Sequence, residues 1–186
     1  MTTAGTPDIP RAAIDGLNST PAPLTDAVPL LPRTSGLYAW WAAPEVFPNL
    51  PGLPSSADPS VRLLYLGIAT SLHSRIAGNH LARSGSSTLR RTLAGLLLPT
   101  EHYQTTWTDR VILVPEDEQR LTAWMRIHLR LTWFACEQPR QHERTLITVL
   151  RPPLNVEGAE HGDACDMVKA AKAAYAASAG PRHTRP

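Results

Sequence analysis

The sequence contains few of the residues that build disulfide frameworks, metal clusters or membrane spans. Only two of its 186 residues are cysteines, Cys136 and Cys165, which excludes a disulfide framework or a cysteine-based zinc cluster and suits packing or surface positions. Its apolar runs are only a few residues long, whereas a membrane-spanning helix needs about 18 apolar residues. Residues 1–7 show neither the basic nor the apolar region of a secretory signal. We therefore expect a cytoplasmic protein with no membrane contact.

Several widespread catalytic signatures are also missing. The histidines are not arranged as His-Glu-x-x-His, and neither a P-loop nor a Gly-x-Gly-x-x-Gly motif is present. There is no Gly-x-Ser-x-Gly elbow. The sequence therefore gives no support for four classes of enzyme: zinc hydrolases, nucleotide-driven enzymes, dinucleotide-dependent enzymes and serine hydrolases with a nucleophile elbow.

Charge is distributed unevenly along a chain whose net charge is only +2. Lysine is scarce, because 16 of the 18 basic residues are arginines. Residues 62–100 carry five arginines and no acidic residue; the arginines are Arg62, Arg75, Arg83, Arg90 and Arg91. Arginine binds phosphate in a bidentate manner, so this segment suits an anionic partner. An arginine-rich genome is the alternative explanation.

The length fits one domain of roughly 100 to 150 residues with flexible ends. Residues 1–33 are rich in proline and show no period, so we predict a disordered or loosely docked lead-in. We place the domain at residues 34–158. An alanine-rich C-terminal helix and tail follow at 159–186.

Hydrophobic patterning predicts an α+β domain. Apolar runs at 36–41, 63–68 and 129–134 are typical of strands. The proline-rich stretch 43–60 is expected to be a loop. Helices are predicted after residue 70, from 88, from 116 and after Pro139, and a small hairpin is predicted between residues 103 and 114.

Four polar residues stand out by their position in these elements. Glu143 precedes Leu146, Ile147 and Leu150 by three, four and seven residues, so its carboxylate leans toward a packed face. It would bind a metal or a hydrogen-bond network, or it would accept free backbone N–H groups of the first helical turn.

Arg75 follows the second predicted strand and would bind a phosphate or be a solvated helix residue. Tyr38 and Tyr65 lie in otherwise apolar strands, so each phenol must reach a partner at a pocket or lie at the sheet margin.

Taken in order, these pieces resemble the GIY-YIG nuclease family. Gly36-Leu37-Tyr38 matches the first motif and Tyr65-Leu66-Gly67 the second, and Arg75 lies in the helix that follows. A later helix carries Glu143, and residues 152–155 resemble the closing Pro-x-x-Asn segment. Five elements in the right order are far more specific than either tripeptide alone.

The resemblance implies a small three-stranded antiparallel sheet flanked by helices, to which this chain adds a hairpin and helix insert. It also implies one Mg²⁺ or Mn²⁺ ion held by Glu143, since a lone carboxylate suffices when water and substrate phosphate complete the shell. Tyr38 would deprotonate or orient the attacking water, and Tyr65 would support the water or the phosphate. Arg75 would stabilise the developing charge.

Gly36, Gly67 and Asn155 would support the site, the last by hydrogen bonds. Leucines replace the motif isoleucines at 37 and 66, which conserves volume. Many relatives carry a proton-handling residue one helical turn after the arginine, but Asn79 occupies that position here. His80, although a candidate catalytic residue, would swing away from Arg75 in an α-helix unless Gly78 breaks it.

The expected function is metal-dependent endonucleolytic cleavage of phosphodiester bonds, with DNA as the nucleic-acid partner. Arg83, Arg90 and Arg91 are further candidates for binding phosphate. The alternatives are a non-catalytic nucleic-acid-binding module on the same fold, motivated by the displaced histidine and by the five-arginine segment 62–100, and a nuclease acting on RNA. No separate DNA-reading motif is evident, so either target specificity is low, or a partner protein or the inserts at 43–60 and 85–118 supply it.

Overall fold

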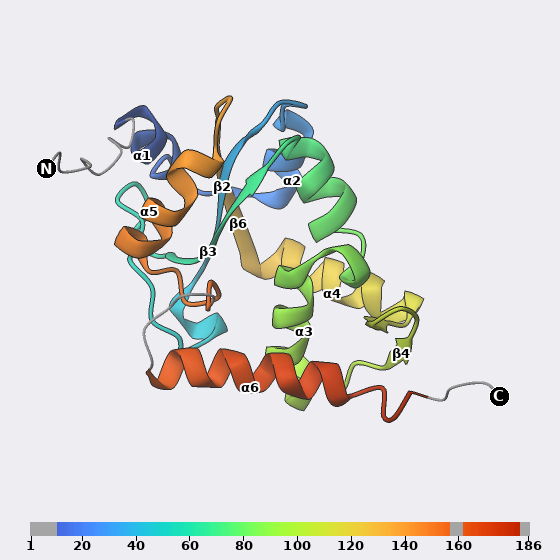
Figure 1. Cartoon of the computed structure of the whole chain (residues 1–186). Coiled ribbons are helices and arrows are strands. Elements are labelled where there is room, and N and C mark those ends of the chain that lie inside the picture. Colours follow the sequence, from blue (N-terminus) through green and yellow to red (C-terminus); the bar gives the residue numbers. More distant parts are fainter. Residues whose placement is uncertain (1–10, 157–161, 183–186) are drawn as a thin grey trace, which may run out of the picture.

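The computed structural model describes residues 11–156 and 162–182 and has the expected α+β architecture (Figure 1). Three long strands form its centre: β2 (Gly36–Ala42), β3 (Arg62–Ala69) and β6 (Leu129–Ala135). β2 lies between β6 and β3 and is antiparallel to both. A short strand, β1 (Ala22–Pro23), adds to the sheet beside β6. The predicted antiparallel sheet is confirmed, with one short strand added.

The central strand β2 is buried along its whole length. A strand covered on both faces is a continuous apolar run, which explains its sequence. Its residues alternate between two cores: Leu37 and Ala39 contribute to one, whereas Tyr38 and Trp40 contribute to the other. The Tyr38 side chain therefore points into the interior of the protein.

Residues 11–33 are part of the folded domain, so the interpretation of residues 1–33 as a loosely attached lead-in is wrong for this part; residues 1–10 lie outside the described residues. They form α1 (Arg11–Leu17), α2 (Leu24–Ala27) and a 3-10 turn, η1 (Val28–Leu30). Thr132 Oγ1 donates to the Leu17 carbonyl at 2.8 Å and accepts from Trp41 Nε1 at 2.9 Å. Elements this short show no sequence period and owe their stability to packing on the sheet.

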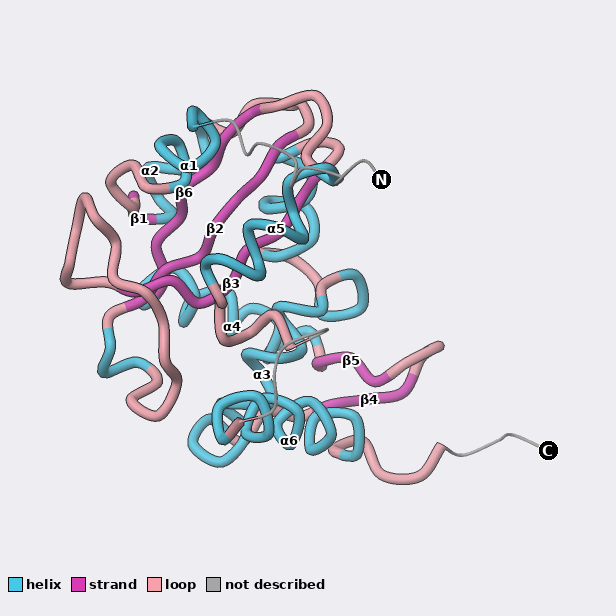
Figure 2. Tube along the Cα trace, turned by 60° about the vertical axis from the view of Figure 1, so that its left-hand side comes forward, coloured by secondary structure: helices cyan, strands magenta, loops and turns pink. Residues whose placement is uncertain are grey.

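The chain between β3 and β6 builds one large helical side of the molecule. The predicted hairpin and the helices that flank it are confirmed. In chain order, the elements are η3 (Ser74–His80), η4 (Ser84–Ser86), α3 (Thr88–Glu101), β4 (Thr105–Trp107), β5 (Val111–Leu113) and α4 (Pro115–His128). Figure 2 shows the β4–β5 hairpin standing apart from the main sheet, beside the end of the last helix.

Two helices complete the fold after β6. They are α5 (Arg140–Leu150), which packs near β3, and α6 (Asp163–Ala177), which crosses α3 (Figure 1). A Cβ on Gly95 of α3 would lie 2.2 Å from the Ala171 carbonyl oxygen, so glycine is what lets these helices cross closely. α6 buries Val168 and Tyr175 in the main core. The predicted C-terminal helix is thus confirmed as an element and packs on the central domain.

The outer edge of β3 is covered by two segments from distant parts of the chain. The first comes from the loop 43–60, which also contains a 3-10 turn, η2 (Pro44–Val46): Leu63 N–H donates to Leu53 O at 2.9 Å. In the second, Leu154 N–H donates to Leu64 O at 3.0 Å. Among the described residues, no helix is long and apolar enough to cross a membrane.

Candidate active site

A hydrogen-bonded chain of buried side chains begins at Tyr38. The Tyr38 hydroxyl lies 2.7 Å from His80 Nε2, and His80 Nδ1 lies 2.7 Å from Ser87 Oγ. Ser87 is the N-cap of α3, and its Oγ accepts the Arg90 backbone N–H at 3.0 Å. The side chains of Tyr38, His80 and Ser87 are all fully buried. The tyrosine of the first motif is thereby connected to the start of α3.

Arg75 also takes part in this series of hydrogen bonds, as a donor to Tyr38. Its Nε–H donates to the Tyr38 hydroxyl oxygen at 3.4 Å. With His80 in the Nδ1–H tautomer, the Tyr38 O–H donates to His80 Nε2 and His80 Nδ1–H donates to Ser87 Oγ. His80 Nε2 is therefore placed to accept a proton from Tyr38.

His80 reaches Tyr38 because η3 is a π-helix. The Leu81 N–H donates to the Ile76 carbonyl oxygen, five residues earlier, at 2.9 Å, which is the π pattern. In this wider helix the fifth residue after Arg75 stays on the same face. An α-helix would turn it away at about 100° per residue. The expectation that His80 swings away from the site is therefore wrong, and the sequence signal for the π turn is weak.

The two motif glycines make room for neighbouring groups. Gly67 lies opposite Tyr38 in the strand register, and a Cβ on Gly67 would lie 2.5 Å from the Tyr38 hydroxyl oxygen. A Cβ on Gly36 would lie 2.4 Å from the Phe134 carbonyl oxygen. Gly67 thus admits the Tyr38 ring, and Gly36 permits the close approach of β6.

Arg75 covers the Tyr38 hydroxyl in this structure. Tyr38 has no exposed surface, whereas Arg75 is partly exposed and also donates through Nη1 to the Ser86 carbonyl at 3.1 Å. Arg75 lines a depression of about 620 Å³ together with Ser74, Asn79 and Arg140. Arg75 thus contacts the buried Tyr38 hydroxyl and also borders this depression.

The protonation states of Tyr38 and His80 follow from their burial. Burial raises the pKa of Tyr38 above its usual range, and Tyr65 adds to this increase whereas Arg75 opposes it. Burial also lowers the pKa of His80, and the charges of Arg75 and Arg90 lower it further. At neutral pH a protonated phenol therefore faces a neutral imidazole, which can act as a proton acceptor.

A second depression, which we call the Glu143 cleft, brings together the remaining candidates. It measures about 530 Å³ and is lined by Tyr65, Glu143 and Asn155. The Tyr65 ring centroid lies 6.3 Å from the rings of both Tyr38 and His80. Three basic residues that the sequence analysis did not single out also line it: Arg140, Arg144 and Lys172. Arg140 borders both depressions, so Arg75 and Glu143 belong to one continuous surface.

Arg140 and Glu143 occupy the first turns of α5, where a spacing of three residues places both side chains on one face. That spacing was the available sequence signal for Arg140. Arg144 and especially Lys172, from a helix far along the chain, could be assigned to the cleft only from the fold.

The surroundings of the Glu143 carboxylate suit the binding of a metal cation. Burial raises its pKa, and the charge of Arg140 partly offsets this effect. Within residues 11–156 and 162–182, no hydrogen bond or ion pair engages its carboxylate, so backbone N–H groups of α5 do not satisfy it. In the described part of the chain, no group of three or more His, Cys, Asp or Glu side chains is arranged so that it could hold a metal ion. A Mg²⁺ ion, which takes one or two carboxylates and keeps several waters, fits such a lone ligand in an open cleft.

Asn155 fastens the closing segment to β3. Its Oδ1 accepts the Leu66 N–H at 2.9 Å, and its Nδ2 donates to the Leu66 carbonyl at 2.8 Å. The side-chain amide thus pairs with the edge strand as a neighbouring strand would. Because Leu66 follows Tyr65 directly, this pairing fixes the backbone that carries Tyr65 at the cleft.

The three arginines predicted to bind phosphate lie in different environments. Arg90 is fully buried: its Nε pairs with Glu118 Oε2 at 2.6 Å, and its Nη1 donates to the His80 carbonyl at 3.2 Å. The prediction for Arg90 is therefore wrong, since it is an internal ion pair that supports His80. Arg91 is partly buried and donates to the Ser84 carbonyl at 2.6 Å, whereas Arg83 is exposed.

Comparison with known proteins bears on this arrangement. A model of the GIY-YIG catalytic domain matches residues 36–174, from the first residue of β2 into α6. No curated protein and no solved structure gives a significant match. The matched range contains both tyrosines, Arg75, His80 and Glu143, and it includes most of the last helix. Since the matched range covers more than half of the chain, the protein belongs to the GIY-YIG catalytic domain family, and this membership indicates nuclease activity in general.

Proposed function

We propose that the protein is a divalent-metal-dependent endonuclease that hydrolyses phosphodiester bonds in DNA. The observation that carries this proposal is the hydrogen-bonded series from Arg75 through Tyr38 to His80, which lies beside the cleft that contains the Glu143 carboxylate. A nuclease needs a proton acceptor, a cation near the scissile phosphate and positive charge for the transition state. Each need has a residue to meet it here.

The residues have distinct tasks in this proposal. Glu143 holds the cation, which when bound supplies Lewis-acid stabilisation of the phosphate. Arg75 leaves the Tyr38 hydroxyl and binds the scissile phosphate, where it stabilises the charge of the transition state. Tyr65 orients the attacking water at the cleft wall. Asn155 positions Tyr65 by holding Leu66.

Proton transfer follows the buried chain. As Tyr38 accepts the proton of the attacking water, its own hydroxyl proton passes to His80 Nε2, 2.7 Å away. The resulting imidazolium is held by Ser87 Oγ at Nδ1. Since a neutral imidazole is the proton acceptor, the lowered pKa of His80 keeps it in the state in which it can act.

The alternative of a non-catalytic binding module was motivated by a displaced histidine and by the five arginines of residues 62–100. The 2.7 Å distance between His80 Nε2 and the Tyr38 hydroxyl weighs against the first of these two motives. Cleavage of DNA and cleavage of RNA use the same phosphate chemistry. Both nucleic acids are therefore tested as substrates.

The test is cleavage of end-labelled duplex, single-stranded and branched DNA and of RNA, in Mg²⁺, Mn²⁺ or EDTA. We expect Glu143→Gln and Arg75→Ala each to reduce the cleavage rate by at least about 100-fold. Glu116→Gln removes an exposed carboxylate from α4 and serves as the matched control. It should cleave like the wild type.

Three outcomes would contradict the proposal in different ways. Cleavage that persists in EDTA or in Glu143→Gln would exclude the metal role of Glu143. Cleavage of RNA alone would replace the DNA substrate. Binding of all substrates without any cleavage, in protein prepared free of contaminating nuclease, would favour the binding module.

A further inference from the structure

A third depression continues the Glu143 cleft along α6 to the β4–β5 hairpin. We call it the hairpin groove. It measures about 480 Å³ and is lined by Arg91, Trp107 and Arg110. Thr88 and Lys172 line both the hairpin groove and the Glu143 cleft. A linear ligand bound at Glu143 can therefore pass over Lys172 into the groove.

The continuous surface formed by the cleft and the groove is positively charged. Five basic side chains line it, against two acidic ones, Glu143 and Asp109. The basic residues are Arg91, Arg110, Arg140, Arg144 and Lys172. Such a tract suits a chain of phosphates, since each lysine or arginine can replace a counterion of a nucleic acid.

The positive charges in the groove repel one another. Burial lowers the pKa of Arg91, and the charges of Arg110 and Arg75 lower it further. Asp109 offsets part of this repulsion, but it is exposed and already pairs with Arg110 Nε at 3.0 Å. A bound phosphate would relieve the repulsion more fully than Asp109 does.

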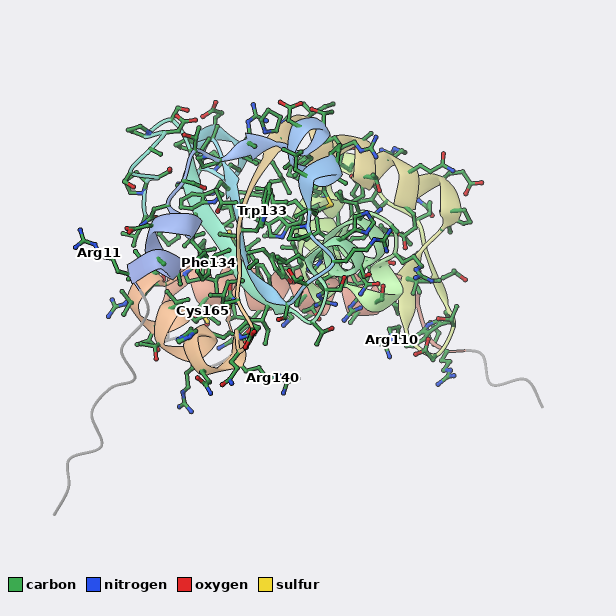
Figure 3. The ribbon with its side chains drawn as sticks, turned by 90° about the horizontal axis from the view of Figure 1, so that it is seen from above. Arg11, Arg110, Trp133, Phe134, Arg140 and Cys165 are labelled. Atoms are coloured by element: carbon green, nitrogen blue, oxygen red, sulfur yellow. The ribbon has the colours of Figure 1, made fainter. Side chains whose placement is uncertain are left out.

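The hairpin is held in a fixed position beside the groove. Thr105 Oγ1 lies 2.7 Å from Ser178 Oγ, and Trp107 Nε1 donates to the Gly180 carbonyl at 2.9 Å. Both contacts join the hairpin to the segment that follows α6. Figure 3 shows Arg140 and Arg110 projecting from the same edge of the molecule. The two ends of the basic tract therefore lie along one edge of the molecule.

We propose that the hairpin groove binds the segment of nucleic acid that flanks the scissile phosphate, with Arg110 and Lys172 as its principal phosphate contacts. This inference rests on the proposed function, because it takes the Glu143 cleft as the position of the scissile bond. It assigns a substrate-binding role to the part of the insert at 85–118 that forms the hairpin. The contacts are to the backbone, so they increase affinity without selecting a base sequence.

The test is equilibrium binding of fluorescein-labelled duplex DNA, measured by fluorescence anisotropy in EDTA so that no cleavage occurs. Arg110→Ala and Lys172→Ala should each raise the Kd several-fold and reduce the slope of log K against log salt by roughly 0.9. Arg126→Ala removes an exposed arginine of α4 that does not line the tract. It should leave both the Kd and the slope unchanged.

A second variant moves binding in the opposite direction, which loss of folding could not do. Asp109→Asn removes the negative charge beside Arg110 and should lower the Kd about two- to threefold.

The outcomes separate this inference from the proposed function. If Arg110→Ala and Lys172→Ala bind like the wild type while the wild type cleaves DNA, the groove is not a binding site and the nuclease proposal stands. If both variants bind more weakly and no substrate is ever cleaved, the groove stands and the nuclease proposal fails. If the wild type binds no DNA at all, the groove proposal is overturned.

Discussion

Replacement of Gly67 by alanine is the sharpest test of the site geometry. The new Cβ would lie 2.5 Å from the Tyr38 hydroxyl oxygen, 2.6 Å from Tyr38 Cζ and 2.9 Å from Tyr65 Cε1. Ordinary contacts between such atoms are about 3.5 to 4.0 Å, so the Tyr38 ring must retreat by roughly 1 Å. Tyr38 has no exposed surface, and β2 is paired on both sides. Retreat of that size would break the 2.7 Å hydrogen bond to His80.

The expected loss of unfolding free energy in Gly67→Ala has two contributions. Overpacking of a closed core costs about 1 to 3 kcal/mol. The buried Tyr38 and His80 groups that lose their hydrogen bond add about 1 to 3 kcal/mol. We therefore expect Gly67→Ala to reduce the free energy of unfolding by about 2 to 6 kcal/mol, a large share of the roughly 5 to 15 kcal/mol typical of a domain.

The assay is urea unfolding followed by circular dichroism, with cleavage measured on the same preparation. Gly78→Ala is the matched control, because no atom lies within 4 Å of the Cβ it would add. A helical alanine is favoured over glycine by about 0.5 to 1 kcal/mol, so Gly78→Ala should be neutral or stabilising. A change of less than about 0.5 kcal/mol in Gly67→Ala, with cleavage retained, would refute the close-approach argument.

Two further predictions concern buried charge and protonation. Arg90→Ala leaves Glu118 without its buried partner and should reduce the free energy of unfolding by about 3 to 5 kcal/mol; a urea midpoint equal to that of exposed Arg126→Ala would contradict it. His80 has a lowered pKa in the folded state, so below pH 6.5 the unfolded chain binds a proton that the folded protein does not. Stability should therefore fall by up to about 1.4 kcal/mol per pH unit as the pH drops from 6.5. The fall between pH 6.5 and 5.5 should be smaller in His80→Gln, and equal slopes would disprove the linkage.

The strands and the family could be predicted from the sequence because their signals are local. Short apolar runs predict β2, β3 and β6, and the two tripeptide motifs lie inside the first two of these strands. The N-cap at Ser87 and the acidic first turn of α4 can likewise be recognised from a few consecutive residues. Local patterns were sufficient wherever the structure follows from residues within one element.

The rest depends on contacts between distant parts of the chain. The π turn that brings His80 to Tyr38 has no periodic signature, and an α-helical period gave the wrong face. Arg90 was predicted to bind phosphate, but Glu118, 28 residues later, pairs with its guanidinium and allows it to be buried. The position of Lys172 at the Glu143 cleft follows only from the packing of α6 on α3.

The coverage of β3 has a consequence for the solubility of the folded protein. An exposed edge strand can pair with a second chain, and the buried, apolar β3 would be a strong template for such aggregation. Backbone groups near Leu53 and Leu154, together with the Asn155 amide, already occupy its edge. At the other edge β1 has only two residues, and Pro23 lacks an N–H to offer. The loop 43–60, for which the family resemblance suggests no role, thereby helps to keep the sheet from growing between molecules.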